Sequence, residues 1–215
     1  TIRFVTMGDS QRWYDETEDF VKEINKRNDI DFVIHGGDMS DFGLTKEFLW
    51  QRDIMNGLNV PYVVLIGNHD CLGTGAETYK AVFGPTNFSF IAGNVKFVCL
   101  NTNALEYDYS EPVPNFTFME QEITSRLDEF EKTVISMHAR PYTDVFNDNV
   151  AKVFQHYIRQ YPGIQVCTAA HTHHYQDDVI FDDGIHYVTS DCMDYRTYLV
   201  FTITPEKYEY ELVKY

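Results

Sequence analysis

Residues 60–70 read VPYVVLIGNHD, an almost unbroken apolar run that ends abruptly in three polar residues. The β-branched and leucine side chains of residues 63–66 are typical of a strand that is buried on both faces. Asn68, His69 and Asp70 follow directly after Gly67, and such residues are costly to place near a core unless they are paired or coordinate a metal. The stretch therefore predicts a buried strand that delivers polar side chains to a functional site at its carboxyl end.

Four further motifs have the same design, because each ends or follows an apolar, strand-like run. They are Gly8-Asp9-Ser10-Gln11, Gly36-Gly37-Asp38, His138-Ala139-Arg140-Pro141 and Ala170-His171-Thr172-His173. A lone Gly-Asp pair after a strand is usually a turn, so each motif by itself is a weak signal. Adjacent parallel strands, however, bring their carboxyl ends to one edge of a sheet. Five such motifs therefore predict a site with carboxylate, amide and imidazole donors.

The first half of the chain alternates strands and helices. Strands are expected over residues 2–7, 31–35 and 60–66, and helices over residues 15–28 and 45–58. Asp15 with Glu18 and Thr117 with Glu120 resemble capping boxes at the starts of two helices. Continuous apolar strands that alternate with amphipathic helices indicate a parallel sheet covered on both faces.

The second half adds helices and then strands only. Helices are expected over residues 76–83, 117–130 and 149–161, and strands over residues 88–92, 95–100, 133–137, 164–169, 179–181, 185–189, 198–203 and 208–213. The predicted fold class is α/β, with two packed mixed β-sheets flanked by helices. The later hairpins are expected to complete the second sheet, and residues 1–215 are expected to form one domain.

Charge and composition limit the classes of partner. The 215 residues carry 33 acidic and 17 basic side chains, a net charge of −16 that disfavours nucleic-acid binding. A small phosphate ester is not excluded, because bound divalent metals supply local positive charge. No apolar run reaches the roughly 20 residues that span a bilayer, and the composition is typical of a soluble protein. The chain starts at Thr1 without an initiator Met, so we expect trimming, by recombinant expression or by export; the compartment and the oligomeric state stay open.

Taken together, the five motifs resemble the calcineurin-like metallophosphoesterases. The pattern of that family is Asp-x-His, Gly-Asp, Gly-Asn-His-Asp/Glu, a lone His and Gly-His-x-His, and the similarity extends from Met7 to His173. The resemblance implies an α/β sandwich and two divalent metal ions, either Mn²⁺, Fe²⁺/Fe³⁺ or Zn²⁺. It implies that one metal is bound by Asp9, Gln11 and His173, the second by Asn68, His138 and His171, and both by a bridging Asp38.

Three positions bear on how closely the chain follows that pattern. Gln11 stands where the family usually has His, and an amide oxygen is a weaker, harder donor that favours Mn²⁺ or Fe over Zn²⁺. Ala170 replaces the usual Gly, with little expected consequence. Asp41 occupies the position at which purple acid phosphatases carry a tyrosine ligand, which argues against an iron–tyrosinate site.

The predicted mechanism uses a hydroxide that two metals activate for in-line attack on phosphorus. His69 is expected to assist the leaving group, and Asp70 to orient His69 and raise its pKa; a loop-capping carboxylate is the alternative role for Asp70. Residues expected to line the mouth of the site and bind substrate are Arg12, Trp13, Tyr14, Arg140 and Arg196, together with Tyr142, Tyr175 and Tyr195.

The main functional hypothesis is a metal-dependent hydrolase of small phosphate mono- or diesters. One alternative is a catalytically silent relative that uses the fold as a binding module, and such relatives tend to lose the metal ligands. A second alternative is a nuclease of the same family, which the acidic surface and the absence of basic runs disfavour. The sequence does not select between a monoester and a diester.

Overall fold

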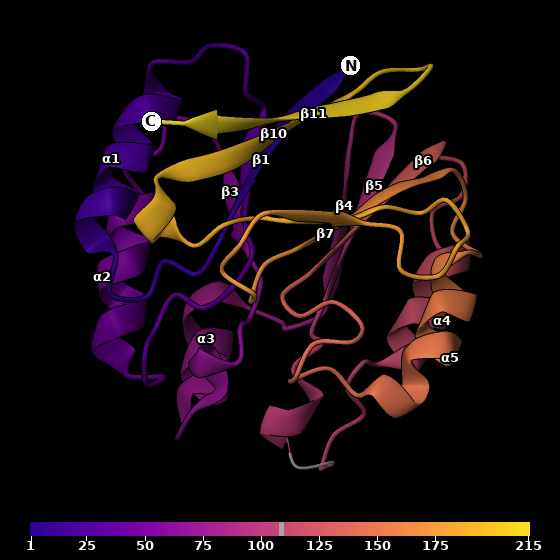
Figure 1. The fold of residues 1–215 in the computed structure, drawn as a ribbon, viewed down its shortest axis with the longest axis horizontal. Coiled ribbons are helices and arrows are strands. Elements are labelled where there is room, and N and C mark those ends of the chain that lie inside the picture. Colours follow the sequence, from indigo (N-terminus) through magenta and orange to yellow (C-terminus); the bar gives the residue numbers. More distant parts are fainter. Residues whose placement is uncertain (108–109) are drawn as a thin grey trace.

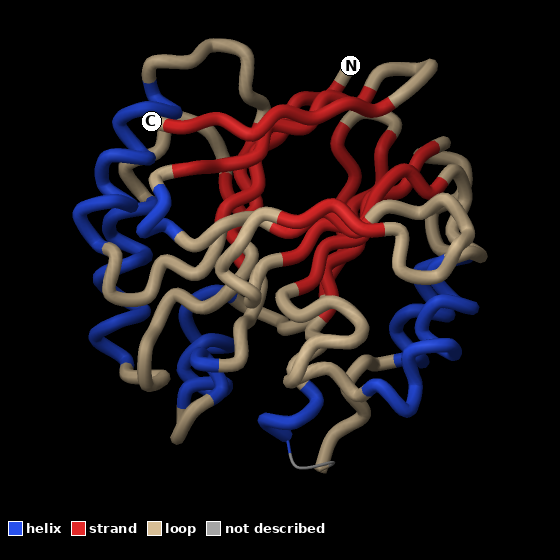
Figure 2. Tube along the Cα trace, in the orientation of Figure 1, coloured by secondary structure: helices blue, strands red, loops and turns tan. Residues whose placement is uncertain are grey.

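The computed structural model describes residues 1–107 and 110–215. Two β-sheets pack face to face in the middle, with helices α1 to α3 on one outer side and α4 and α5 on the other (Figure 1). Figure 2 shows the strands between the two helical flanks, and several of the connecting loops below them. The fold class predicted from the sequence, two mixed sheets flanked by helices, is confirmed.

The first sheet has a parallel centre with an antiparallel hairpin added at one side. Its strand order is β11 (Tyr208–Lys214), β10 (Thr197–Ile203), β1 (Ile2–Met7), β2 (Phe32–His35) and β3 (Tyr62–Val64). Strands β1, β2 and β3 run parallel, and β10 pairs antiparallel with β1. The helices on this side are α1 (Tyr14–Asn25), α2 (Thr45–Met55) and α3 (Gly75–Phe83).

The second sheet also has a parallel centre, with one antiparallel strand at each edge. Its strand order is β4 (Phe88–Ala92), β5 (Val95–Leu100), β6 (Lys132–Met137), β7 (Ile164–Ala169), β9 (Tyr187–Thr189) and β8 (Gln176–Asp178). Strands β5, β6, β7 and β9 are parallel, and the two edge strands are antiparallel to their neighbours. The remaining helices are α4 (Phe116–Thr124) and α5 (Ala151–Ile158), with short 3₁₀ turns η1 (His69–Cys71), η2 (Ala104–Tyr107), η3 (Asp148–Val150) and η4 (Met193–Tyr195).

Strand β1 shows why the central strands are apolar on both faces. Phe4 points between the sheets, where its ring stacks on Phe201 at 5.1 Å and meets the edge of Phe97 at 5.0 Å. Val5 and Met7 point the other way and pack against α1 and α2. Both faces of the strand are therefore buried, and the polar residues that follow it emerge only at its carboxyl end.

Two expectations about the later strands are wrong. The hairpin of β10 and β11 completes the first sheet, because β10 pairs with β1. Residues 179–181 form no strand; β8 lies at Gln176–Asp178 instead. The reason is that Ile180 and Phe181 pack against the outer core of the second sheet, while the polar stretch before them pairs its backbone with β9.

The two predicted capping boxes are also wrong. Helix α1 begins after Trp13, which caps it without a side-chain hydrogen bond. Helix α4 is capped by Asn115, whose side chain accepts a hydrogen bond from Phe118 N. Helix α4 stops at Thr124, well before the predicted residue 130, because the Lys96 ammonium binds the carbonyl oxygens of its last turn. No helix within residues 1–107 and 110–215 is long and apolar enough to cross a membrane.

Candidate metal centre

The five motifs meet in space at the carboxyl ends of five strands. Asp9 follows β1, Asp38 follows β2, Asn68 follows β3, His138 follows β6, and His171 follows β7. Backbone hydrogen bonds lock these loops together, from Asp9 N to Gly37 O at 2.9 Å and from Ala170 N to His138 O at 2.9 Å. The convergence that the parallel strands predict is therefore present, and it joins both sheets.

Four of the expected ligands have left-handed backbone conformations. The φ angles are 51° at Asp9, 57° at Asp38, 73° at His171 and 63° at His173. Non-glycine residues rarely adopt this region, and at a functional site such strain is retained where it aims a side chain. Here the left-handed residue bends the chain sharply as it leaves each strand, which turns the side chains towards one another.

Gly67 lets two of these loops approach closely. A Cβ atom at this position would lie 2.1 Å from Asp38 Oδ1 and 2.2 Å from Asp38 N. No side chain fits there, so the glycine before Asn68 is needed for the carboxylate of Asp38 to enter the centre of the cluster.

The side chains form two groups that could each hold a cation. One group contains Asp38, His138 and His171, the other contains Asp9, Asp38 and His173, and the donor atoms of each group lie within 4.8 Å of one another. Asp38 belongs to both groups, as a bridging ligand must. Asn68 joins the first group, because its Oδ1 lies 3.0 Å from His138 Nε2 and 3.0 Å from His171 Nδ1.

Two buried oxygens in the cluster support a metal site. Asp9 Oδ1 and Gln11 Oε1 are shielded from solvent and accept no hydrogen bond in the described part of the chain; the ion-pair contact of Asp9 Oδ1 is the ring nitrogen Nε2 of His173, at 3.4 Å. Leaving such atoms unpaired costs free energy that coordination to a cation would recover. The Gln11 amide also lies against the shared carboxylate, with Nε2 3.4 Å from Asp38 Oδ2. These residues fit a dinuclear divalent metal site.

The electrostatics of the cluster favour positive charge. Burial lowers the pKa of His138, but the Asp38 carboxylate outweighs it and raises that pKa to about 9. The contact with the Asp9 carboxylate, whose Oδ1 lies 3.4 Å from His173 Nε2, raises the pKa of His173 to about 10. Burial would raise the pKa of Asp38, yet the nearby His138 holds it below the usual range. The same carboxylates would stabilise a divalent cation bound in the cluster.

His69 lies at the rim of the cluster, and Asp70 does not contact its ring. The His69 Nδ1 atom lies 2.8 Å from the carbonyl oxygen of Asp41, and its backbone N–H donates to Asp38 Oδ1 at 2.9 Å. The fully buried Asp70 instead accepts hydrogen bonds from the backbone N–H groups of residues 38, 39, 40 and 67 and from Ser40 Oγ. The expectation that Asp70 orients His69 is therefore wrong; Asp70 organises the loops that carry Asp38 and Asn68.

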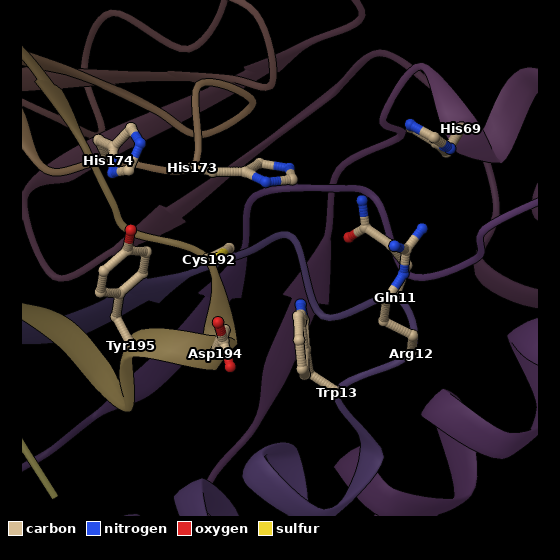
Figure 3. Close-up of a pocket in the computed structure, with 9 residues that line it drawn as sticks. All are labelled: Gln11, Arg12, Trp13, His69, His173, His174, Cys192, Asp194 and Tyr195. Atoms are coloured by element: carbon tan, nitrogen blue, oxygen red, sulfur yellow. The ribbon is translucent and has the colours of Figure 1, made fainter.

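A cleft of about 280 Å³ opens beside the cluster. Among the expected substrate residues, Arg12, Trp13 and Tyr195 line it, and Figure 3 shows them around His173. Tyr14 is not among the lining residues, and its ring forms an edge-to-face pair with Trp50, with the centroids 5.7 Å apart.

The other expected substrate residues have structural contacts elsewhere. Arg140 pairs with Asp178 at 2.8 Å, and Arg196 pairs with Asp19 at 2.8 Å. Neither arginine lines the cleft, and their role in substrate binding stays a prediction. Tyr175 hydrogen-bonds to Tyr210, and Tyr142 packs against Phe181.

Several residues near the site carried no signal in the sequence. Asp144 Oδ1 lies 2.6 Å from His171 Nε2, and His174, Cys192 and Asp194 line the cleft. Asp144 and Asp194 have no sequence motif around them. Only the contacts made after folding identify them.

The comparison with known families agrees with this geometry. A sequence model described as calcineurin-like phosphoesterase matches residues 2–175. The chain belongs to this family, whose members are metal-dependent phosphoesterases with a dinuclear divalent metal site. Among curated protein sequences, none matches the chain.

Solved structures with the same fold span nearly the whole chain. A dimetal phosphatase from Danio rerio is similar with a TM-score of 0.75 and 11% identity, over 99% of this chain and 97% of that one. GAP50, the anchor in the inner membrane complex of Plasmodium, has a TM-score of 0.72 and 11% identity, over 99% and 84%. The protein TT1561 of Thermus thermophilus has a TM-score of 0.66 and 13% identity, over 98% and 99%. At these identities the likeness shows the fold alone.

Proposed function

We propose that this chain hydrolyses small phosphate mono- or diesters. In this proposal two divalent cations are held by Asp9, Gln11, Asp38, Asn68, His138, His171 and His173. The observation that carries the proposal is the pair of ligand groups that share Asp38. When bound, two such cations activate water for in-line attack and neutralise the phosphate oxygens. Mn²⁺ or Fe fits the oxygen-rich group with Gln11 better than Zn²⁺ does.

His69 is the group proposed to assist the leaving oxygen. A carbonyl oxygen can only accept, so the Nδ1 atom that faces Asp41 O carries a proton. Nε2 is then the ring nitrogen available to a substrate in the cleft that His69 lines. As an imidazolium, His69 would give its Nε2 proton to the departing alkoxide. The hydrogen bond to Asp41 O holds the ring during that transfer.

Arg12 also helps to position His69, the proposed general acid. Its guanidinium forms an ion pair with the carboxylate of Asp41. The backbone carbonyl of Asp41 in turn holds the His69 ring. We infer that Arg12 positions the loop of Asp41, and through it the general acid, in addition to facing the substrate.

The binding-module alternative draws support from the Plasmodium anchor, which shares the fold. That similarity says nothing about metal ligands in the Plasmodium protein. In this chain the expected donors lie in contact with one another. The enzyme proposal is therefore preferred. The nuclease alternative is disfavoured by the net charge of −16.

The test is hydrolysis of p-nitrophenyl phosphate and bis(p-nitrophenyl) phosphate by protein loaded with Mn²⁺. We expect turnover with Mn²⁺, its loss with a chelator, and a rate reduced by at least about 100-fold in Asn68→Ala. His69→Asn should bind metal as the wild type does but lose about 10²–10⁴-fold in rate.

Metal analysis separates the two functional classes. A catalyst should bind close to two Mn²⁺ per chain, and Asn68→Ala should bind less. Metal-loaded wild type that is inert on both esters and on a wider ester panel would favour the silent module. Activity that is equal in Asn68→Ala and wild type would contradict the assigned ligands.

A further inference from the structure

The cleft beside the ligand cluster has two chemically different ends. At the cluster end lie Gln11, His69 and His173, where a phosphate would bind. At the other end Trp13, Asp194 and Tyr195 face the same space, with Cys192 between the two ends (Figure 3). The second end contains two large aromatic rings and one carboxylate, which is unlike a phosphate site.

The aromatic end is built on fixed elements. Tyr195 is the last residue of η4, and the next residue, Arg196, is left-handed with φ 54° and ends that turn. Arg196 NH1 lies 2.8 Å from Asp19 on α1, which ties η4 to the helix that starts after Trp13. The edge of the His174 ring lies against Tyr195 at 5.5 Å. The two aromatic walls are therefore held in place before any ligand arrives.

The charges of the cleft are not balanced at this end. Among the lining residues, Arg12 is already paired with Asp41 and His173 with Asp9. Asp194 forms no ion pair within residues 1–107 and 110–215. The whole chain carries a net charge of −16, which favours the approach of a cation over that of an anion. A positively charged ligand group would be drawn to Asp194.

We propose that the Trp13–Asp194–Tyr195 end of the cleft binds an organic cation carried by the substrate. The substrate class is then a phosphate ester of an amino alcohol, such as a choline or ethanolamine ester, with its phosphate at the metal end; this rests on the proposed function. Aromatic faces and a carboxylate together attract an ammonium group, and quaternary ammonium ions bind best to Trp and Tyr faces. A neutral ring would stack on the same walls but would leave the charge of Asp194 uncompensated.

Binding is tested first, without metal and without turnover. The chain has only two tryptophans, Trp13 and Trp50, so Trp50→Phe leaves the cleft residue as the single indole reporter. Choline should quench or shift the Trp13 fluorescence at a concentration roughly tenfold below that of 3,3-dimethylbutanol, its neutral isostere. Equal responses to the two compounds, or a tighter response to adenosine than to choline, would overturn the proposal.

Hydrolysis then tests the same preference with Mn²⁺ bound. The kcat/KM for p-nitrophenyl phosphorylcholine should exceed that for p-nitrophenyl 3,3-dimethylbutyl phosphate by roughly tenfold. In Asp194→Asn and in Tyr195→Leu this ratio should fall towards one. Asp128→Asn, which removes an exposed carboxylate outside the cleft, should keep the wild-type ratio. A ratio that survives in Asp194→Asn would contradict the assigned role of the carboxylate.

The two failures are distinguishable. If both esters are hydrolysed at equal rates, the metal-dependent activity stands and the cation site is wrong. If choline binds selectively but no ester is hydrolysed, the cation site stands and the proposed hydrolase is wrong.

Discussion

Asp144 Oδ1 lies 2.6 Å from Nε2 of His171, while Nδ1 of the same ring lies 3.0 Å from Asn68 Oδ1. The imidazole therefore faces the ligand cluster with one nitrogen and an exposed carboxylate with the other. Such a carboxylate fixes the ring orientation and strengthens the other nitrogen as a metal donor. Asp144 belongs to the loop after β6, so the second sheet supports a ligand that follows β7.

Replacing Asp144 by Asn should weaken metal binding without unfolding the chain. The amide keeps the size of the side chain but removes the charge that supports His171, so we expect a roughly 10- to 100-fold lower affinity for one Mn²⁺. Calorimetric titration of metal-free protein measures both sites separately. Asp182→Asn, which changes an exposed turn residue, serves as the control and should match wild type. Identical titrations for Asp144→Asn and wild type would show that the contact does not support the metal.

Gly36 and Ala170 should be energetically coupled. A Cβ atom at Gly36 would lie 2.9 Å from the Ala170 methyl and 3.3 Å from Met7 O, so Gly36→Ala should cost about 1–3 kcal/mol of unfolding free energy. In the Gly36→Ala/Ala170→Gly double variant the main clash is gone. Urea unfolding of the four proteins should give a coupling energy above about 1 kcal/mol. Strictly additive effects would mean that the two methyl groups do not compete for the same space.

His35 should make the protein less stable in mild acid. Burial, reinforced by the charge of His138, lowers the pKa of His35 from 6.5 to about 3. Its ring hydrogen-bonds to Ser10 Oγ at 2.8 Å and accepts from Gly37 N at 3.1 Å, which requires the neutral form. Between pH 6.5 and 3 the unfolded chain binds a proton that the folded chain does not, so stability falls as the pH decreases. The slope is about 1.4 kcal/mol per pH unit.

The comparison that isolates this effect is wild type against His35→Gln, unfolded by urea from about pH 7 to about pH 5 in a chelator. The variant starts less stable, yet its stability should decline less steeply with falling pH. If the two curves run parallel, His35 does not titrate as its surroundings indicate.

Lys96 should be among the most sensitive positions outside the site. Its side chain is fully buried, and Nζ binds Glu122 Oε2 at 2.8 Å, Ser125 Oγ at 2.7 Å and the carbonyl oxygens of both residues. Lys96→Met leaves the partly buried Glu122 carboxylate without its counter-ion and two carbonyl groups without their donor, which costs roughly 3 kcal/mol. Denaturant midpoints measure the loss.

Lys132 offers the matched control on the neighbouring strand. Its ammonium makes a hydrogen bond to Gln165 Oε1 at 3.4 Å, and Lys132→Met should cost less than about 1 kcal/mol. A small effect at Lys96, equal to that at Lys132, would show that α4 does not depend on the buried ammonium.

Much of the fold could be predicted because strand periodicity and polar strand ends are local features. The parallel centre of the first sheet was expected, since runs such as residues 63–66 are apolar on both faces and can only be buried. The partner of β10 was not predictable, because an apolar strand pairs equally well with either sheet edge until the packing of Phe201 on Phe4 selects one. The end of α4 was missed for a similar reason, since Lys96 reaches it from a strand 26 residues away.

The candidate metal centre, too, could be predicted only in part from the sequence. The residue types that follow each strand, from Asp9 to His173, are set by the local order of apolar run, glycine and donor, and this order alone predicted that donors gather at one edge. Which donor contacts which was decided by the tertiary structure. Asp70 binds backbone N–H groups instead of His69, Arg140 and Arg196 pair with carboxylates outside the cleft, and Asp144 supports His171. The physical reason is that side-chain contacts depend on distances of a few ångströms between segments far apart in the chain, and only the packing of the two sheets sets those distances.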